Sequence, residues 1–191
     1  MEHLFGTPLH VATCMGHADA VRSLIKHGAN IDDANNPYLK TPLMMTPHAE
    51  VARILIENGA AINTMTDGIN TPLHCAALKG HEEKALLLIQ YGANVNACRN
   101  GKNTPLIWAI RRRRINMVKL LISHGADINA RDAFLDTPLY MAIRSKDICI
   151  VELLVNAGAD LTITDTRGET PYDYCVRNQY SNVYTDLLKR S

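Results

Sequence analysis

The segment TPLHCAALKGH, residues 71–81, decides how this chain folds. Its threonine can cap a helix, and the proline that follows suits the first helical turn, where no N–H is needed. The small side chain of Ala76 lets a neighbouring helix approach closely. Gly80-His81 then provides a turn. The segment therefore predicts a short helix that begins at Pro72 and leads through a tight turn into a second helix.

The same Thr-Pro step occurs six times along the 191 residues. The steps begin at Thr7, Thr41, Thr71, Thr104, Thr137 and Thr170, with spacings of 34, 30, 33, 33 and 33 residues. A second marker is a Gly-Ala pair that follows a leucine by four residues, and it begins at Gly28, Gly59, Gly92, Gly125 and Gly158. The leucine column lies on one helical face, and the glycine can end that helix in the left-handed conformation. Each repeat is therefore expected to be a pair of helices.

A helix pair of this kind has a single apolar side and cannot bury it alone, whereas a stack of pairs makes a continuous core. Aromatic residues make up only 5% of the chain, which is few for the core of a β-sandwich or barrel. We therefore expect a single domain over residues 1–191, built from repeats that start near residues 4, 37, 67, 100, 133 and 166.

The chain resembles the ankyrin repeat family in its period near 33, its TPLH elements at Thr7–His10 and Thr71–His74, and its Gly-His turns. The resemblance extends from about residue 4 to residue 188. It implies an all-α ankyrin-repeat solenoid of stacked helix-turn-helix units with β-hairpin or loop tips. It also implies a protein–protein interaction scaffold or adaptor, which binds a partner protein through a concave face formed by the hairpin tips and the first helices.

The second repeat is shorter than the others. Thr41 to Gly59 spans 18 residues, whereas the corresponding span is 21 in the other repeats that have a Gly-Ala pair. Pro47 prevents the first helix from continuing, so this helix should lack about one turn. A shortened second-repeat helix also resembles the small ankyrin inhibitors of cyclin-dependent kinases. A kinase-inhibitor-like protein is therefore an alternative interpretation.

A ladder of arginines is the main candidate for a binding site. Seven residues after the Thr of the Thr-Pro step, three consecutive repeats carry an arginine, and a further one follows the first: Arg111, Arg144 and Arg177, with Arg112. Guanidinium groups bind carboxylates bidentately, so this ladder suits an acidic peptide. Three carboxylates lie close by in sequence and can neutralise part of the patch: Asp132, Asp136 and Glu169.

Three further residues are candidate contacts with a partner protein. Lys79 occupies an exposed position of a first helix, eight residues after Thr71. Phe134 and Tyr38 lie at predicted tips, where they can supply the aromatic anchors that dominate binding energy at protein interfaces.

The run Arg111–Arg114 supports another alternative, in which the chain binds a polyanion such as nucleic acid or a phosphoinositide. The net charge of +1 gives no global preference for such a ligand, so nucleic acid is not the partner we expect. Neither G-x-x-x-x-G-K-[ST] nor G-x-S-x-G occurs, so we expect no enzyme, no catalytic residue and no cofactor. The histidines fall at helix starts, turns and helix ends, so we expect no metal site.

The five cysteines are odd in number and widely spaced, which favours a reducing compartment. No run of about 18 apolar residues occurs, so we expect no membrane insertion. We expect a monomer in the cytoplasm or the nucleus. Asn129 follows Leu121 and Asp127 at spacings that resemble those of asparagine-hydroxylated ankyrin proteins, which implies the same modification here.

Overall fold

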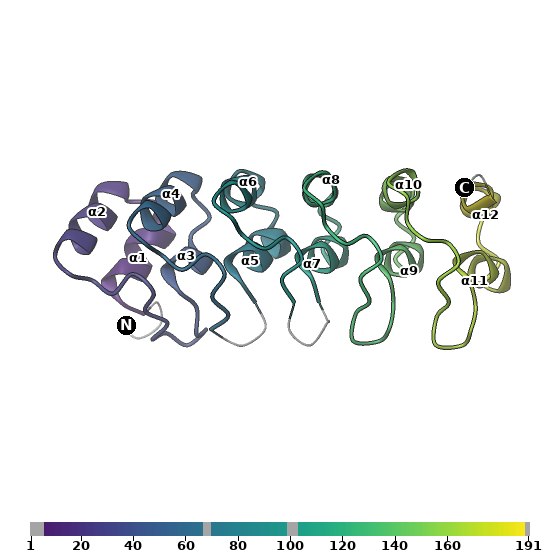
Figure 1. The fold of residues 1–191 in the computed structure, drawn as a ribbon, viewed down its shortest axis with the longest axis horizontal. Coiled ribbons are helices and arrows are strands. Elements are labelled where there is room, and N and C mark those ends of the chain that lie inside the picture. The colour runs from purple at the N-terminus through teal and green to yellow at the C-terminus, as the bar shows by residue number, and fades with distance from the viewer. Residues whose placement is uncertain (1–5, 67–69, 99–102, 190–191) are drawn as a thin grey trace. The chain divides into compact units, whose positions relative to one another are not determined.

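The computed structural model describes residues 6–66, 70–98 and 103–189. All regular secondary structure within these ranges is helical (Figure 1). The chain divides into two compact units, Met1–Ala97 and Cys98–Ser191, and each is a stack of three helix pairs. The expected all-α repeat architecture is thus confirmed. The predicted starts of repeats 1, 3 and 4, near residues 4, 67 and 100, lie outside the described residues.

The first unit contains six helices in its described part: α1 (Pro8–Met15), α2 (Ala18–Lys26), α3 (Pro42–Met45), α4 (Ala49–Glu57), α5 (Pro72–Lys79) and α6 (Glu82–Gln90). The first helices of the repeats, α1, α3 and α5, form one layer, and α2, α4 and α6 form the other (Figure 1).

The second unit likewise contains six helices in its described part: α7 (Pro105–Arg111), α8 (Ile115–Ser123), α9 (Pro138–Arg144), α10 (Ile148–Asn156), α11 (Pro171–Arg177) and α12 (Asn182–Lys189). Its first helices are α7, α9 and α11. The loops that precede α9 and α11 project from this layer, on the side away from α8, α10 and α12 (Figure 1).

The Thr-Pro step starts the first helix of each repeat as its chemistry predicts. In five repeats the threonine Oγ1 accepts a hydrogen bond from the backbone N–H three residues later, at 3.2–3.4 Å; these are Thr41, Thr71, Thr104, Thr137 and Thr170. Proline follows as the first helical residue, where its missing N–H leaves no bond unmade. One dipeptide thus satisfies an orphan donor and fixes the helix start.

The Gly-Ala pair ends the second helix by a Schellman motif. Its glycines have φ between 82° and 94°. The alanine N–H then donates to the carbonyl of the leucine five residues earlier, at 2.9–3.0 Å, as Ala126 does to Leu121. The same leucines, apart from Leu24, are fully buried between the helices. The spacing from leucine to glycine therefore records a helix end and a core position together.

Helix α3 is four residues long, whereas the other first helices have seven or eight. The backbone carbonyls at its C-terminal end accept hydrogen bonds from a buried lysine of the next repeat. Lys84 of α6 is 1% exposed, and its Nζ donates to the carbonyl of Thr46 at 2.8 Å and to that of Met44 at 3.4 Å. Burial lowers the pKa of Lys84 from 10.5 to about 8. The ammonium group thus occupies the end of a shortened helix, where carbonyls point outward and favour a cation.

None of the helices in the described ranges is both long and apolar enough to cross a membrane.

Candidate functional site

Three loop tips have one geometry. They are residues 36–40, 132–136 and 165–169, each directly before a Thr-Pro step. The first residue of each tip is Asn or Asp, and its side-chain oxygen accepts hydrogen bonds from two backbone N–H groups of the tip. Asp132 Oδ1, for example, accepts from Phe134 at 2.7 Å and from Asp136 at 3.0 Å. Asn36 and Asp165 do the same in their own tips. Each tip therefore has a defined shape and is not an unrestrained loop.

Two of these tips expose an aromatic residue followed by leucine at the same two positions. Tyr38 and Leu39 are 59% and 56% exposed, and Phe134 and Leu135 are 71% and 48% exposed. Both leucines have positive φ, 48° for Leu39 and 65° for Leu135. The third tip has Gly168 at that position, with φ 77°. A leucine in this conformation costs about 1–2 kcal/mol relative to an unstrained one, so two apolar pairs are displayed at the expense of stability.

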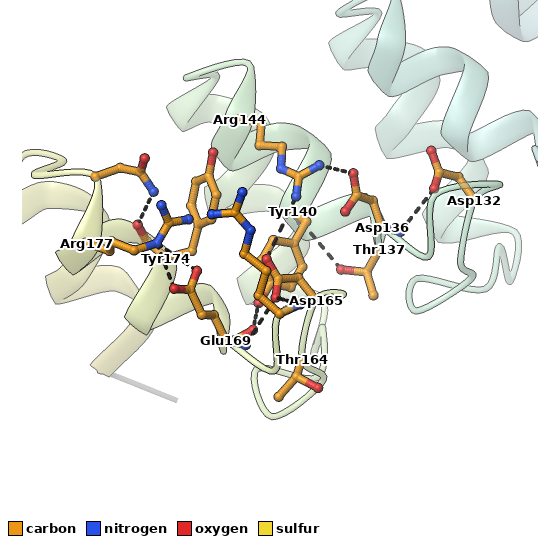
Figure 2. A network of polar contacts seen from close by, with 12 residues as sticks. Asp132, Asp136, Thr137, Tyr140, Arg144, Thr164, Asp165, Glu169, Tyr174 and Arg177 are labelled. Carbon is orange, nitrogen blue, oxygen red and sulfur yellow. Dashed lines mark hydrogen bonds and ion pairs between the residues drawn. The ribbon is translucent and has the colours of Figure 1, made fainter.

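The arginine ladder is paired with carboxylates of the tips, and Figure 2 shows the pairs of Arg144 and Arg177. Arg111 forms an ion pair with Asp132 at 2.8 Å, and Arg177 forms one with Glu169 at 2.7 Å. Arg144 donates to Asp136 and lies 4.0 Å from Asp165. The three arginines therefore lie where the sequence places them, at the ends of α7, α9 and α11, but their charges are balanced from within the second unit.

Aromatic rings hold the same guanidinium groups in place. Arg111 lies 5.5 Å from the centre of the Trp108 ring, and Arg144 lies over both Tyr140 and Tyr174, at 5.9 and 5.5 Å. The Tyr140 hydroxyl donates to the backbone carbonyl of Glu169 (Figure 2). Burial raises the pKa of the Asp136 carboxyl, and Arg144 opposes that shift. Ion pairs and ring contacts thus fasten the tips to the first helices.

The basic run of residues 111–114 carries less unbalanced charge than its sequence suggests. Arg113 Nε donates to the buried carboxylate of Asp147 at 2.7 Å, so both it and Arg111 are ion-paired. Arg112 and Arg114 are exposed, and in the described part of the chain neither forms an ion pair. Two of the four positive charges in this run are therefore balanced by carboxylates of the same unit.

The structure brings Tyr38 and Lys79 together at one recess in the first unit. The recess has a volume of about 180 Å³ and is lined by Cys14, Tyr38, Lys40, Met44, Met45 and Lys79. Sequence reasoning selected two of these six residues as contacts. The recess itself was not predicted. The sequence shows that the first helix of this repeat ends before Pro47, but it does not show that side chains of the neighbouring repeats leave the resulting space open.

The metal and modification predictions concern other parts of the chain. Within the residues that the structure describes, no three His, Cys, Asp or Glu side chains are grouped so as to hold a metal ion. Asn129 lies in an exposed loop, where its Oδ1 accepts from the Asp160 N–H at 2.9 Å and its own N–H donates to Asp127. Its hydroxylation stays a prediction.

Comparison with known proteins gives matches along most of the chain. A family model described as "Ankyrin repeats (3 copies)" matches residues 2–66 and 47–132, and one described as "Ankyrin repeat" matches residues 135–166. The "Ankyrin repeat and SOCS box protein 9" of Mus musculus is 35% identical over 79 residues. That match covers 40% of this chain and about a quarter, 27%, of the length of the mouse protein.

Proposed function

This chain belongs to the ankyrin repeat family, whose repeats are generally protein–protein interaction modules, and we propose that it binds a partner protein through its loop tips and first helices. One observation carries the proposal. Two tips each expose an aromatic residue followed by a leucine, and the leucine has a positive φ. Exposed aromatic side chains on a rigid turn are the type of anchor that dominates protein interfaces. Strained backbone of this kind gathers at functional sites.

The other candidate contacts take two different roles in this proposal. Phe134 and Tyr38 touch the partner as anchors, and Lys79, which lines the same recess as Tyr38, and Arg112 are exposed cations. The side chains of Arg111, Arg144 and Arg177 act mainly by holding the tips against the first helices, because their charges are already paired. An acidic segment of the partner would therefore meet the unpaired cations, not the ladder.

Two other interpretations have weaker support. Polyanion binding through residues 111–114 would draw on four arginines, of which Asp132 and Asp147 already balance two. The kinase-inhibitor interpretation depends on the short α3 alone and stays a sequence-based prediction. We also propose the cytoplasm or the nucleus as the location, which the five free cysteines support.

Affinity capture with purified chain tests the proposal. Tyr38→Ser and Leu39→Gly in one tip, combined with Phe134→Ser and Leu135→Gly in the other, remove both apolar pairs. We expect this variant to lose at least about tenfold in recovery of the specific partners, which corresponds to about 1.4 kcal/mol.

The third tip supplies the matched control. Thr166→Ser with Arg167→Ser changes a tip of the same geometry that has no apolar pair, so capture should stay at the wild-type level. If the variant without the apolar pairs recovers the same partners in the same amounts, the tips are not the binding surface.

A further inference from the structure

The recess in the first unit exists because α3 is short. In the second unit, first helices run seven residues, and Arg144 and Arg177 at their ends turn back onto a carboxylate at the fifth position of the tip. Helix α3 ends at Met45, and Pro47 has no N–H to extend it. The space of the missing turn, between α1 and α5, stays open as the recess of about 180 Å³.

Two lysines place positive charge at the recess. The fifth tip position, which is Asp136 or Glu169 in the second unit, is Lys40 here. Lys79, at the end of α5, also lines the recess. No carboxylate is among the lining residues, and across the described ranges neither lysine takes part in an ion pair. The buried ammonium group of Lys84, bonded to the Met44 carbonyl, adds a third cation below.

The floor of the recess is apolar and adaptable. Met44 and Met45 supply flexible thioethers, which fit side chains of different shapes, and Tyr38 stands exposed at the rim. Pockets that enclose a whole small molecule have roughly 300–1,000 Å³, so about 180 Å³ suits a single large side chain. Carboxylates beside that side chain would meet Lys40 and Lys79.

We propose that this recess binds an acidic peptide segment of a partner protein, which inserts one apolar side chain between Lys40 and Lys79. The proposal deepens the proposed function and rests on it, since it assigns a partner chemistry to the first unit. It places the electrostatic part of recognition in the first unit and not at the arginine ladder.

Selection of random 12-residue peptides displayed on phage, with the full chain as bait, tests the proposal directly. We expect enrichment of peptides in which Leu, Met or Phe has Asp or Glu within two residues. The dissociation constant of the enriched peptides, measured by fluorescence anisotropy at fixed salt, should rise about tenfold or more in Lys40→Glu/Lys79→Glu. Met45→Tyr, which fills the recess without changing the charge, should weaken binding as well.

The matched control reverses the same number of charges elsewhere in the first unit. Lys26→Glu/Arg53→Glu lies on the outer helices α2 and α4, and binding should change less than about twofold. Circular dichroism and the melting temperature confirm that each variant is folded.

Three results would overturn the proposal: no enrichment of acidic peptides, equal binding to Lys40→Glu/Lys79→Glu, or equally tight binding of single-stranded DNA or phosphatidylserine vesicles at the same two lysines. The peptide test and the capture test can fail separately, because the peptides are purified probes. If the peptides do not bind but capture still depends on the tips, the proposed function stands. Failure of the capture test would not alter the peptide result.

Discussion

Leu135 occupies a backbone conformation that glycine adopts at little cost. Its φ of 65° belongs to the left-handed region, and the equivalent residue of the third tip is Gly168. The Asx hydrogen bonds of Asp132 hold the turn in this shape whatever residue stands at the apex. The leucine is therefore retained against the local preference of the backbone, and its exposed side chain is the only thing it adds.

Replacement of Leu135 by glycine should stabilise the protein. Relief of the left-handed strain exceeds the added entropy of the unfolded chain, so the free energy of unfolding should rise by about 0.5–1 kcal/mol. Urea denaturation measures this. Phe134→Gly, at a neighbouring position without positive φ, is the control and should lower the free energy of unfolding. If both variants are destabilised alike, Leu135 is not strained.

Lys84 makes the stability of the first unit depend on pH. Its folded pKa of about 8 lies below the ordinary 10.5, so between these values the unfolded chain binds a proton that the folded chain has lost. Stability should therefore rise as pH increases through this window, by about 1–3 kcal/mol at most.

The free energy of unfolding of the wild type minus that of Lys84→Met isolates this effect, because the other titrating groups are common to both proteins. It should increase from pH 7.5 to pH 10. A difference that stays constant over this range would show that Lys84 titrates normally.

At the scale of elements, the arginines join each tip to the first helix that it precedes or follows. Arg144 ends α9, contacts Asp136 in the tip before that helix, and lies near Asp165 in the tip after it. Its stacking on Tyr140 and Tyr174 connects α9 with α11. One side chain thus restrains two tips and two helices, which a free surface cation would not do.

Arg144→Ala should therefore loosen the tips. We expect faster hydrogen exchange of the Phe134 and Asp136 amides, and a loss of about 1 kcal/mol in stability, since the Arg144 side chain is 40% exposed and its ion pair is screened. Arg112→Ala removes an exposed arginine that has no ion pair in the described residues, so exchange in the tips should not change. Equal effects of the two substitutions would contradict a positioning role for Arg144.

At the scale of the whole molecule, we expect a monomer. The formal net charge is +1, and each described tip that exposes large apolar side chains exposes only two of them. Light scattering coupled to size exclusion should give a mass close to 21.2 kDa. A mass near twice this value at micromolar concentration would show a dimer and contradict this expectation.

The repeat framework could be predicted from sequence, because Thr-Pro and Leu-to-Gly spacings each encode a local hydrogen bond that needs no partner outside the repeat. The site could be predicted only in part. Phe134 and Tyr38 could be predicted because the repeat register puts an aromatic side chain at a loop tip in each case. The balanced charge of Arg144 depends on side-chain geometry between neighbouring repeats, which spacing does not contain. The carboxylates close in sequence were a hint and no more.

Lys84 shows why the rest escaped. It reads as a surface lysine in the sequence Glu82-Glu83-Lys84, although it is fully buried. A signal existed in the register: the residue eight before the glycine is Val51, Met117 or Ile150 in three other repeats. A polar residue at a position that is apolar in the other repeats therefore indicates a side chain that bonds to a neighbouring repeat, as Lys84 does to the carbonyls of Met44 and Thr46.

That bond between Lys84 and the end of α3 has a consequence for the ancestry and engineering of the array. Repeats two and three depend on each other, because the lysine of one bonds to the carbonyls of the other. A duplication or graft that moves the third repeat alone would bury the Lys84 ammonium group without the Met44 and Thr46 carbonyls that accept its hydrogen bonds. A graft of the second repeat alone would leave the carbonyls of Met44 and Thr46 bare. Repeats two and three should therefore be moved together. A library that shuffles the repeats should cut on either side of residues 41–92 and not within them.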